Sequence, residues 1–187
     1  MNPFDTQQQR FDLEWRLLMG LKPLDHPLFG SVARVWRVTL HPSFHDDIAV
    51  TVTDIDAGGW IELRVLPASA RAFAMAAAGY AVAAPFGSPP KPAVFETTLS
   101  ADVLERFATT MPPRPLPPTM MGGRDGVNVD HETLADNAIE RAWSWSPTPQ
   151  RAPAHYAFVR SMCVLAMERF TDPAAQNAVR AIEGYLR

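Results

Sequence analysis

The chain has 187 residues, of which 47% are hydrophobic and 20% are charged. That length fits one domain with a substantial core, and the composition lies close to the globular average, which argues against a chain without a fold. The formal net charge is -3, and the sequence concentrates no basic face of the kind that neutralises phosphates. We therefore do not expect nucleic acid to be a partner.

The sequence predicts a soluble, cytoplasmic protein. Its single cysteine, Cys163, cannot form an intramolecular disulfide, which fits a reducing compartment. Residues 1–15 contain acidic side chains where a signal peptide has a basic start followed by an apolar run. The longest apolar stretch, 72–86, is dominated by alanine and interrupted by Gly79, so it is too weakly apolar to cross a bilayer. We expect no membrane partner.

Spacings of apolar residues predict the elements of the first half of the chain. They are a helix over 5–20, a loop over 21–30, a strand over 31–41, a hairpin over 48–66 and an alanine-rich helix over 68–84. The hairpin has strands at 48–54 and 60–66, and its turn at 56–59 is longer than the minimum.

The second half of the chain continues with a strand over 93–99 and a short helix for which Ser100 is the expected N-cap. A proline-rich connector over 111–123 comes next. Then follow strands at 127–134 and 138–145 and helices at 153–170 and 173–186. A helix over 131–142 competes with the two strands. Asp172 is the expected N-cap of the last helix, with Pro173 at its first position.

These elements predict a single α+β domain over 1–187, with the proline-rich connector at 111–123 inside it. The strands come in hairpins and lack the regular crossover helices of a parallel sheet. We therefore expect an antiparallel sheet of about five to six strands. The alanine-rich helix and the two C-terminal helices are expected to pack on that sheet.

A first polar cluster comprises His41, His45, Asp46 and Asp47. Imidazoles and carboxylates at such spacings bind zinc or iron in other proteins. Pro42 argues against a helix that would bring the two histidines onto one face. We interpret the segment as a solvated connector between strands.

Two further candidates have simpler explanations. Asp54 and Asp56 precede a glycine pair, as in an oxygen-rich cation loop, but Glu62 follows Asp54 by only eight residues and misses the register of a calcium loop. Turn chemistry accounts for both aspartates. Cys163 lies in the apolar stripe of its helix, which indicates a buried small side chain and not an activated nucleophile.

The densest polar cluster is Asp125, Asn128, Asp130, His131 and Glu132. A histidine beside carboxylates fits general acid–base chemistry. In a strand, however, Asp130 and Glu132 point to one face and His131 to the other. We favour an exposed hairpin strand, and this cluster is where a hidden active site would be sought first.

Trp143 and Trp145 share one face of their strand, and Tyr156 follows nearby. Paired tryptophans are more often core, but they also anchor interfaces. Our candidate binding residues are therefore Asp125, Asp130, His131, Trp143 and Trp145. The sequence contains no GxGxxG, GxxxxGK[ST], HExxH or GxSxG motif, so we expect no catalytic residues, no metal and no cofactor.

Residues 120–170 contain the runs GGRDGVNVDHETL and AIERAWSWSP, followed by a helical segment. Through Asp125-Gly126 and the WSWSP run at 143–147, this part resembles small uncharacterised bacterial α+β proteins, some of which are immunity proteins against toxins. The resemblance covers about a quarter of the chain. It implies stoichiometric binding to another protein and supplies no catalytic residues.

Three functions remain open at this point. The favoured one is a non-enzymatic protein-binding domain, and an immunity protein that neutralises a bacterial toxin is one form of it. The second is a small metal-dependent hydrolase or ligand-binding enzyme that uses His131 with nearby carboxylates, or His41 with His45. The third is a structural or assembly subunit in which residues 112–118 form a docking arm. The oligomeric state does not follow from the sequence.

Overall fold

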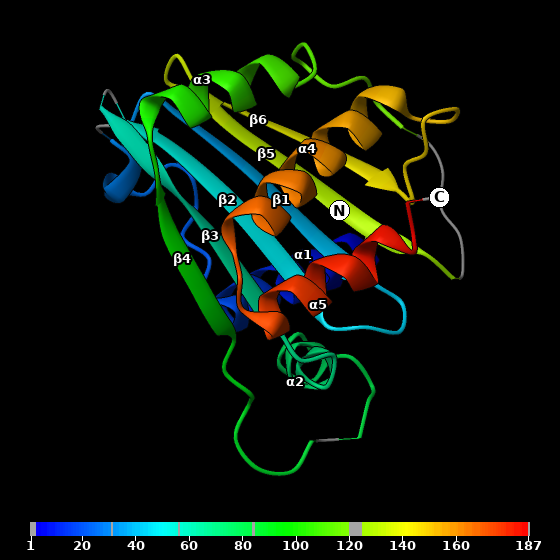
Figure 1. Cartoon of the computed structure of the whole chain (residues 1–187). Helices are drawn as coiled ribbons and strands as arrows, with labels where there is room; N and C mark the ends of the chain where they lie inside the picture. Colours follow the sequence, from blue (N-terminus) through cyan, green and yellow to red (C-terminus); the bar gives the residue numbers. More distant parts are fainter. Residues whose placement is uncertain (1–2, 31, 56, 84, 120–124, 187) are drawn as a thin grey trace.

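The computed structural model describes residues 3–30, 32–55, 57–83, 85–119 and 125–186. It is an α+β fold built on one six-stranded antiparallel sheet with the order β4-β3-β2-β1-β5-β6 (Figure 1). The strands are β1 (Arg34–Pro42), β2 (Asp47–Ile55), β3 (Gly58–Leu66), β4 (Ala93–Leu99), β5 (Val127–Ala135) and β6 (Ala138–Trp145). The predicted fold class is confirmed.

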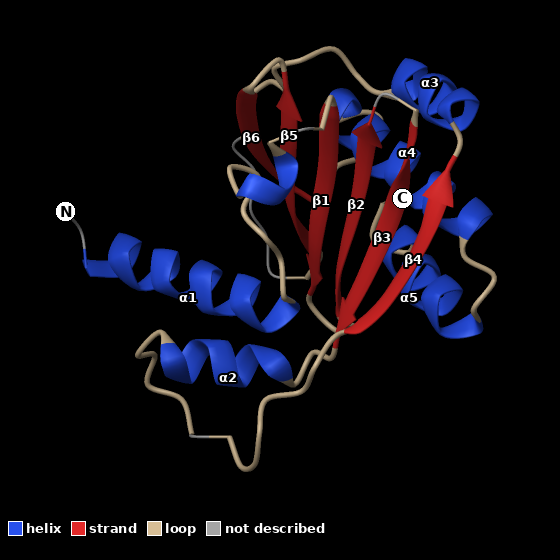
Figure 2. Ribbon diagram, turned by 90° about the vertical axis from the view of Figure 1, so that its left-hand side faces the viewer, coloured by secondary structure: helices blue, strands red, loops and turns tan. Residues whose placement is uncertain are grey.

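The helices cover both faces of this sheet. They are α1 (Pro3–Met19), α2 (Ala70–Ala77), α3 (Ala101–Thr110), α4 (Pro153–Arg169) and α5 (Pro173–Glu183), with a short 3-10 helix η1 (Pro27–Phe29). α3, α4 and α5 lie on one face, and α1 lies on the opposite face beside α2 (Figures 1 and 2). None of the helices in the described ranges combines the length and the apolar character of a bilayer-crossing segment.

Strand alternation gives the sheet one apolar and one polar face. Val38 in β1 lies opposite Val50 in β2 and His131 in β5, on the side of the main core under α3, α4 and α5. The preceding residue of β1, Arg37, points to the other face and lies opposite Glu132 in β5. Because successive side chains of a strand point to opposite faces, one register fixes both layers.

Two hairpin turns set the strand order locally. Pairing of β2 with β3 runs out to Ile55 opposite Gly58, so this loop is shorter than the turn predicted at 56–59. In the hairpin of β5 and β6, Asp136 and Asn137 adopt φ values of 51° and 58°. Positive φ at both loop positions matches the twist of paired strands, and Asp and Asn tolerate this conformation. The two predicted strands are therefore present in place of the competing helix.

The two apolar clusters lie on opposite sides of the sheet. The larger one holds the core of β1, β2 and β3 with the buried faces of α3, α4 and α5, including Phe158 and Ile182. The smaller one joins Trp15 and Met19 of α1 to Ala74 of α2. The alanine-rich helix is shorter than predicted, because it ends at Ala77 before Gly79 takes a φ of 83°.

The described part of the proline-rich connector, 111–119, packs against the domain. Leu116 contacts the main core, and the carbonyl of Pro117 lies 2.7 Å from His155 Nε2 of α4. Thr119 donates a hydrogen bond to the carbonyl of Trp143 in the edge strand β6. The predicted connector also includes 120–123, which lie outside the described residues.

The two predicted N-caps differ in a way that stability measurements can detect. Asp172 accepts hydrogen bonds from the backbone N–H groups of Ala174 and Ala175, whereas Ser100 makes no side-chain cap bond. We expect Asp172→Ala to lower the free energy of unfolding by about 1 kcal/mol. Ser100→Ala should cost less than about 0.5 kcal/mol. Urea denaturation measures both, and equal losses would contradict the capping geometry.

Candidate functional site

The cluster predicted around His131 is split by the sheet. Asp130 and Glu132 point toward α1, whereas His131 is buried in the opposite layer at 2% exposure. His45 lies elsewhere, exposed on the β1–β2 loop, where its Nδ1 is 2.7 Å from the hydroxyl of Tyr185. These side chains therefore do not converge on one pocket.

The face of the sheet beneath α1 carries buried charges. Asp47 is fully buried, and its carboxylate accepts hydrogen bonds from Trp15 Nε1 at 2.8 Å and from Arg71. His41 Nδ1 lies 3.6 Å from Asp47 Oδ1, and His41 Nε2 lies 3.5 Å from Asp130 Oδ2. One imidazole thus lies between a buried carboxylate and a partly exposed one.

The surroundings of His41 decide its protonation state. Burial alone would lower the pKa of His41, but the neighbouring carboxylates of Asp130 and Asp47 raise that pKa to about 9. Burial would likewise raise the pKa of Asp47, and the contacts with His41 and Arg71 hold it below its usual value. With this pKa, the His41 imidazole is protonated at neutral pH. A general base must be unprotonated, so His41 is not suited to that role.

Glu132 is the second buried carboxylate on this face, at 1% exposure. It accepts hydrogen bonds from Arg16 of α1 at 2.9 Å, Arg141 of β6 at 3.0 Å and Arg37 of β1 at 3.3 Å. Burial would raise the pKa of Glu132, but the charges of Arg16 and Arg37 outweigh it and keep the pKa below its ordinary value. Arg37 also donates to the carbonyl of Lys22 at 2.8 Å.

We call the residues of these two centres the polar layer: Arg16, Arg37, His41, Asp47, Arg71 and Glu132. α1 covers it, and the Trp15 indole packs on the His41 ring with centroids 4.2 Å apart. The interpretation of 41–47 as a solvated connector is correct for His45 and Asp46, which are exposed, and wrong for His41 and Asp47. The interpretation of 125–132 as an exposed strand is likewise wrong for His131 and Glu132, which are buried.

A serine–histidine pair lies in the opposite layer. His131 Nε2 is 3.0 Å from Ser144 Oγ, and its ring packs against His155 with centroids 4.7 Å apart. Its Nδ1 is buried without a hydrogen-bond partner, so no carboxylate orients this imidazole as in a catalytic triad. Burial, with a smaller effect of His155, lowers the pKa of His131 to about 3, which leaves it a weak base.

The remaining predicted binding residues lie near the β6 edge. Trp143 and Trp145 share the face that bears Asn128, whose side chain bonds Trp143 Nε1. Trp143 is 38% exposed, so it is not the core residue favoured by the sequence. Asp125 is exposed just before β5 begins, at the end of that strand where Asn128 pairs with Trp145. The structure therefore gathers Asp130, Trp143 and Trp145 on one face and separates them from His131.

The next candidates are a metal site and the Cys163 thiol, considered within the described ranges. No group of three His, Cys, Asp or Glu side chains there is arranged to hold a metal ion. Cys163 is fully buried in α4, as predicted, and burial raises the pKa of its thiol to about 12. A thiol in that state does not act as a nucleophile near neutral pH.

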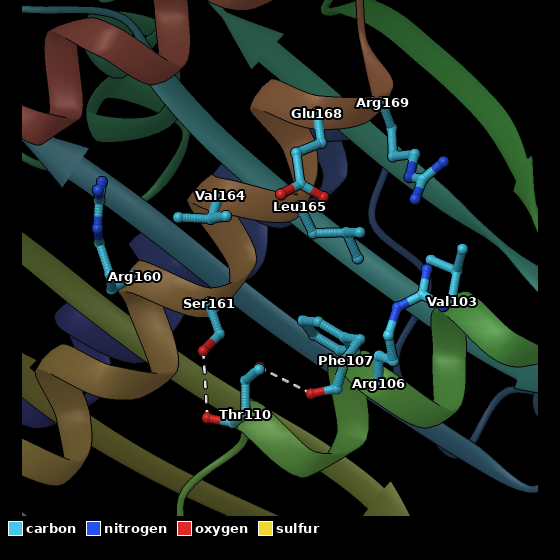
Figure 3. Close-up of a pocket in the computed structure, with 10 residues that line it drawn as sticks. All are labelled: Val103, Arg106, Phe107, Thr110, Arg160, Ser161, Val164, Leu165, Glu168 and Arg169. Atoms are coloured by element: carbon cyan, nitrogen blue, oxygen red, sulfur yellow. Dashed lines mark hydrogen bonds between the residues drawn. The ribbon is translucent and has the colours of Figure 1, made fainter.

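A largely apolar hollow lies on the other side of the molecule, between α3 and α4. This groove of about 330 Å³ is lined by four residues of α3 and six of α4 (Figure 3). Phe107 and Leu165, each 5% exposed, form its apolar floor, and Val164 adds an exposed apolar wall at 37%. We call it the α3–α4 groove.

The charges of the α3–α4 groove have the opposite sign to that of the whole chain. Three arginines and one glutamate, Glu168, line it, although the chain carries a net charge of -3. Arg160 is paired with Glu183 of α5. The guanidinium groups of Arg106 and Arg169 form no ion pair or hydrogen bond with another residue that the structure describes. The groove therefore presents apolar surface together with uncompensated positive charge.

Sequence reasoning missed this groove because its walls are about 50 residues apart in the chain. A signal was present: the run MCVLAM at 162–167 is apolar around the whole helix, more than one core-facing stripe requires. Val164 is the residue of that run that remains exposed in the groove.

Comparison with known proteins gives no match: no protein-family model, no curated protein and no solved structure is similar to this chain. The resemblance to immunity proteins therefore stays a prediction, and the functional argument depends on the geometry alone.

The polar layer predicts a specific pH dependence of stability. Because the pKa of His41 is raised to about 9 in the fold, its stabilising effect is complete below about pH 6.5 and is lost as the pH rises through 9. Within this window the free energy of unfolding should fall by up to about 1.4 kcal/mol per pH unit. His41→Asn should abolish that slope, and His45→Asn, which alters an exposed ring, should keep it. Urea denaturation from pH 6 to 10 measures it; a slope retained in His41→Asn would contradict the assignment.

Proposed function

We propose that the protein is a non-enzymatic protein-binding domain and that the α3–α4 groove is its docking site. The partner supplies an apolar segment that carries a carboxylate. The observation that carries the proposal is the pairing, in one accessible groove, of an apolar floor with the two unpaired guanidinium groups of Arg106 and Arg169.

The pKa values and the burial of the most reactive side chains support a binding role. His41 is held as a cation between two carboxylates, His131 is buried and weakly basic, and the Cys163 thiol is buried. Catalytic acids, bases and nucleophiles instead have pKa values matched to the working pH and reach the substrate. These three groups, the best candidates in the described ranges, meet neither condition.

The shape and chemistry of the groove support a protein partner. Interfaces combine an apolar centre with a polar rim, and arginine is enriched at the positions that contribute most to binding. Phe107 and Leu165 provide the centre, and Arg106 is an exposed part of the rim. Local positive charge on an acidic chain favours an acidic segment of the partner by electrostatic complementarity.

Neutralisation of a bacterial toxin by an immunity protein is the specific form of this role that we propose. It agrees with the resemblance noted over residues 120–170 and with a mechanism that needs stoichiometric binding and no chemistry. In that setting, the toxin presents the segment that enters the groove.

Val164→Asp tests the docking site. The substitution places a carboxylate on the exposed groove wall, where it repels an acidic segment and removes apolar contact, so the partner should be lost. Leu13→Asp is the matched control, because Leu13 is exposed at 57% on α1 across the sheet. The measurement is quantitative co-purification of tagged chains from the native host.

We expect one partner at near-equal molar amount with the wild-type chain and with Leu13→Asp, and a loss of at least about tenfold with Val164→Asp. Circular dichroism of each purified variant verifies the fold. A partner retained by Val164→Asp, or no partner at comparable abundance with the wild-type chain, would be evidence against the proposed function.

A further inference from the structure

The α3–α4 groove has two unlike ends. Ser161 of α4 donates a hydrogen bond to the carbonyl of Thr110 at the C-terminal end of α3, which closes one end (Figure 3). Away from that end, the groove is bordered by Arg106, from the middle of α3, and by Arg169, from the last turn of α4. In Figure 3 the two guanidinium groups lie toward this same end. The groove has one cationic end and one closed end.

Among the described residues, no carboxylate forms an ion pair with the two arginines of the cationic end. The two guanidinium groups make no ion pair or hydrogen bond with another described residue, and the buried Nε of Arg169 has no acceptor. Unpaired like charges near one another and a buried N–H without an acceptor are both unfavourable, so an anion placed here gains from both. The third arginine, Arg160, is already satisfied by Glu183.

The cation that lines the closed end, Arg160, is already paired with Glu183. The Ser161 hydroxyl is bonded to the Thr110 carbonyl, and the Thr110 hydroxyl to the Phe107 carbonyl. Between the two ends lies the apolar floor of Phe107 and Leu165. The groove therefore suits a ligand with a single anionic group at one end of an apolar body.

The length of the groove limits what fits. Its lining on α4 runs from Arg160 to Arg169, which spans about 13 Å at 1.5 Å per helical residue. An extended peptide covers that distance with about four residues. Glu168 also lines the groove, and its carboxylate disfavours an acidic chain that continues past the arginines. A chain that stops at the arginines avoids this repulsion.

We propose that the α3–α4 groove binds the free C-terminus of the partner protein. The terminal α-carboxylate lies between Arg106 and Arg169, and the last apolar side chains cover Phe107 and Leu165. Arginine binds carboxylates through paired charge-assisted hydrogen bonds, and capture of a chain-terminal carboxylate is a recurring mode of peptide recognition. This inference depends on the proposed function and names the segment that the partner presents.

The test uses labelled hexapeptides that differ only in their last residue, each made with a free carboxylate and as the C-terminal amide. Fluorescence anisotropy measures their binding to the full chain at low salt. We expect a peptide ending in an aliphatic residue to bind, and its amide to bind at least about tenfold more weakly, as charge-assisted hydrogen bonds require.

Four variants assign the effect to the groove. Arg106→Gln and Arg169→Gln should each weaken the acid form toward the amide, and Glu168→Gln should strengthen it a few-fold. Arg180→Gln, which removes the same charge from an exposed site on α5, should leave binding unchanged. Thermal unfolding of each variant verifies that it is folded.

Equal binding of acid and amide, acid binding that neither arginine variant weakens, or no binding by any peptide would overturn this proposal. Binding of decanoate by the groove without binding of any peptide acid would assign it to a fatty acid and would also overturn it. These results are separable from failure of the proposed function, because loss of the native partner in Val164→Asp does not depend on the peptide termini.

Discussion

Two carboxylates buried between the sheet and α1 constrain the rest of the molecule. Asp47 and Glu132 are almost fully inaccessible, and each is surrounded by cations or donors from several elements. A buried charge that loses its partners costs several kcal/mol, about 3–5 in measured cases. α1 must therefore place Arg16 and Trp15 over the sheet, and α2 must place Arg71 beside Asp47. The position of both helices follows from this requirement.

The polar layer and the α3–α4 groove lie on opposite faces of the sheet. Charged residues that in another setting would suggest catalysis are used to hold α1 on the sheet, and the helix that they hold covers them. The helices on the opposite face pack through apolar contacts and leave the α3–α4 groove accessible. The guanidinium groups of Arg106 and Arg169, which line it, form no ion pair with another residue that the structure describes. This arrangement is the basis of the binding role that we propose.

Much of the fold follows from local sequence signals. The strand at 93–99 and the strand at 138–145 agree with β4 and β6 at both ends, because alternation and turn residues delimit them. Asp172 was identified as an N-cap and makes the expected bonds. Signals of this kind act over a few residues, so the sequence alone reveals them.

The features that matter most for function are long-range. Pairing of β1 with β5 brings Arg37 to Glu132 across 95 residues, and no local pattern specifies it. Trp15 of α1 covers the partly buried His41 and the fully buried Asp47, so these two residues are not solvated as the sequence suggests. Arg106 and Arg169 likewise meet only after α3 and α4 have packed. The polar layer and the α3–α4 groove therefore could not be predicted from the sequence, because their residues come together only in the folded chain.

A double-mutant cycle of Arg37→Met and Glu132→Gln tests the central role of the polar layer most directly. Both side chains are 2% exposed and joined by an ion pair, so neutralising Glu132 alone leaves a buried cation with less compensation. The account predicts a loss of about 3–5 kcal/mol of unfolding free energy for Glu132→Gln. It also predicts that the double variant loses less than the sum of the single variants by at least about 1 kcal/mol. Losses that add to within about 0.5 kcal/mol would show that the two charges act independently and would contradict the account.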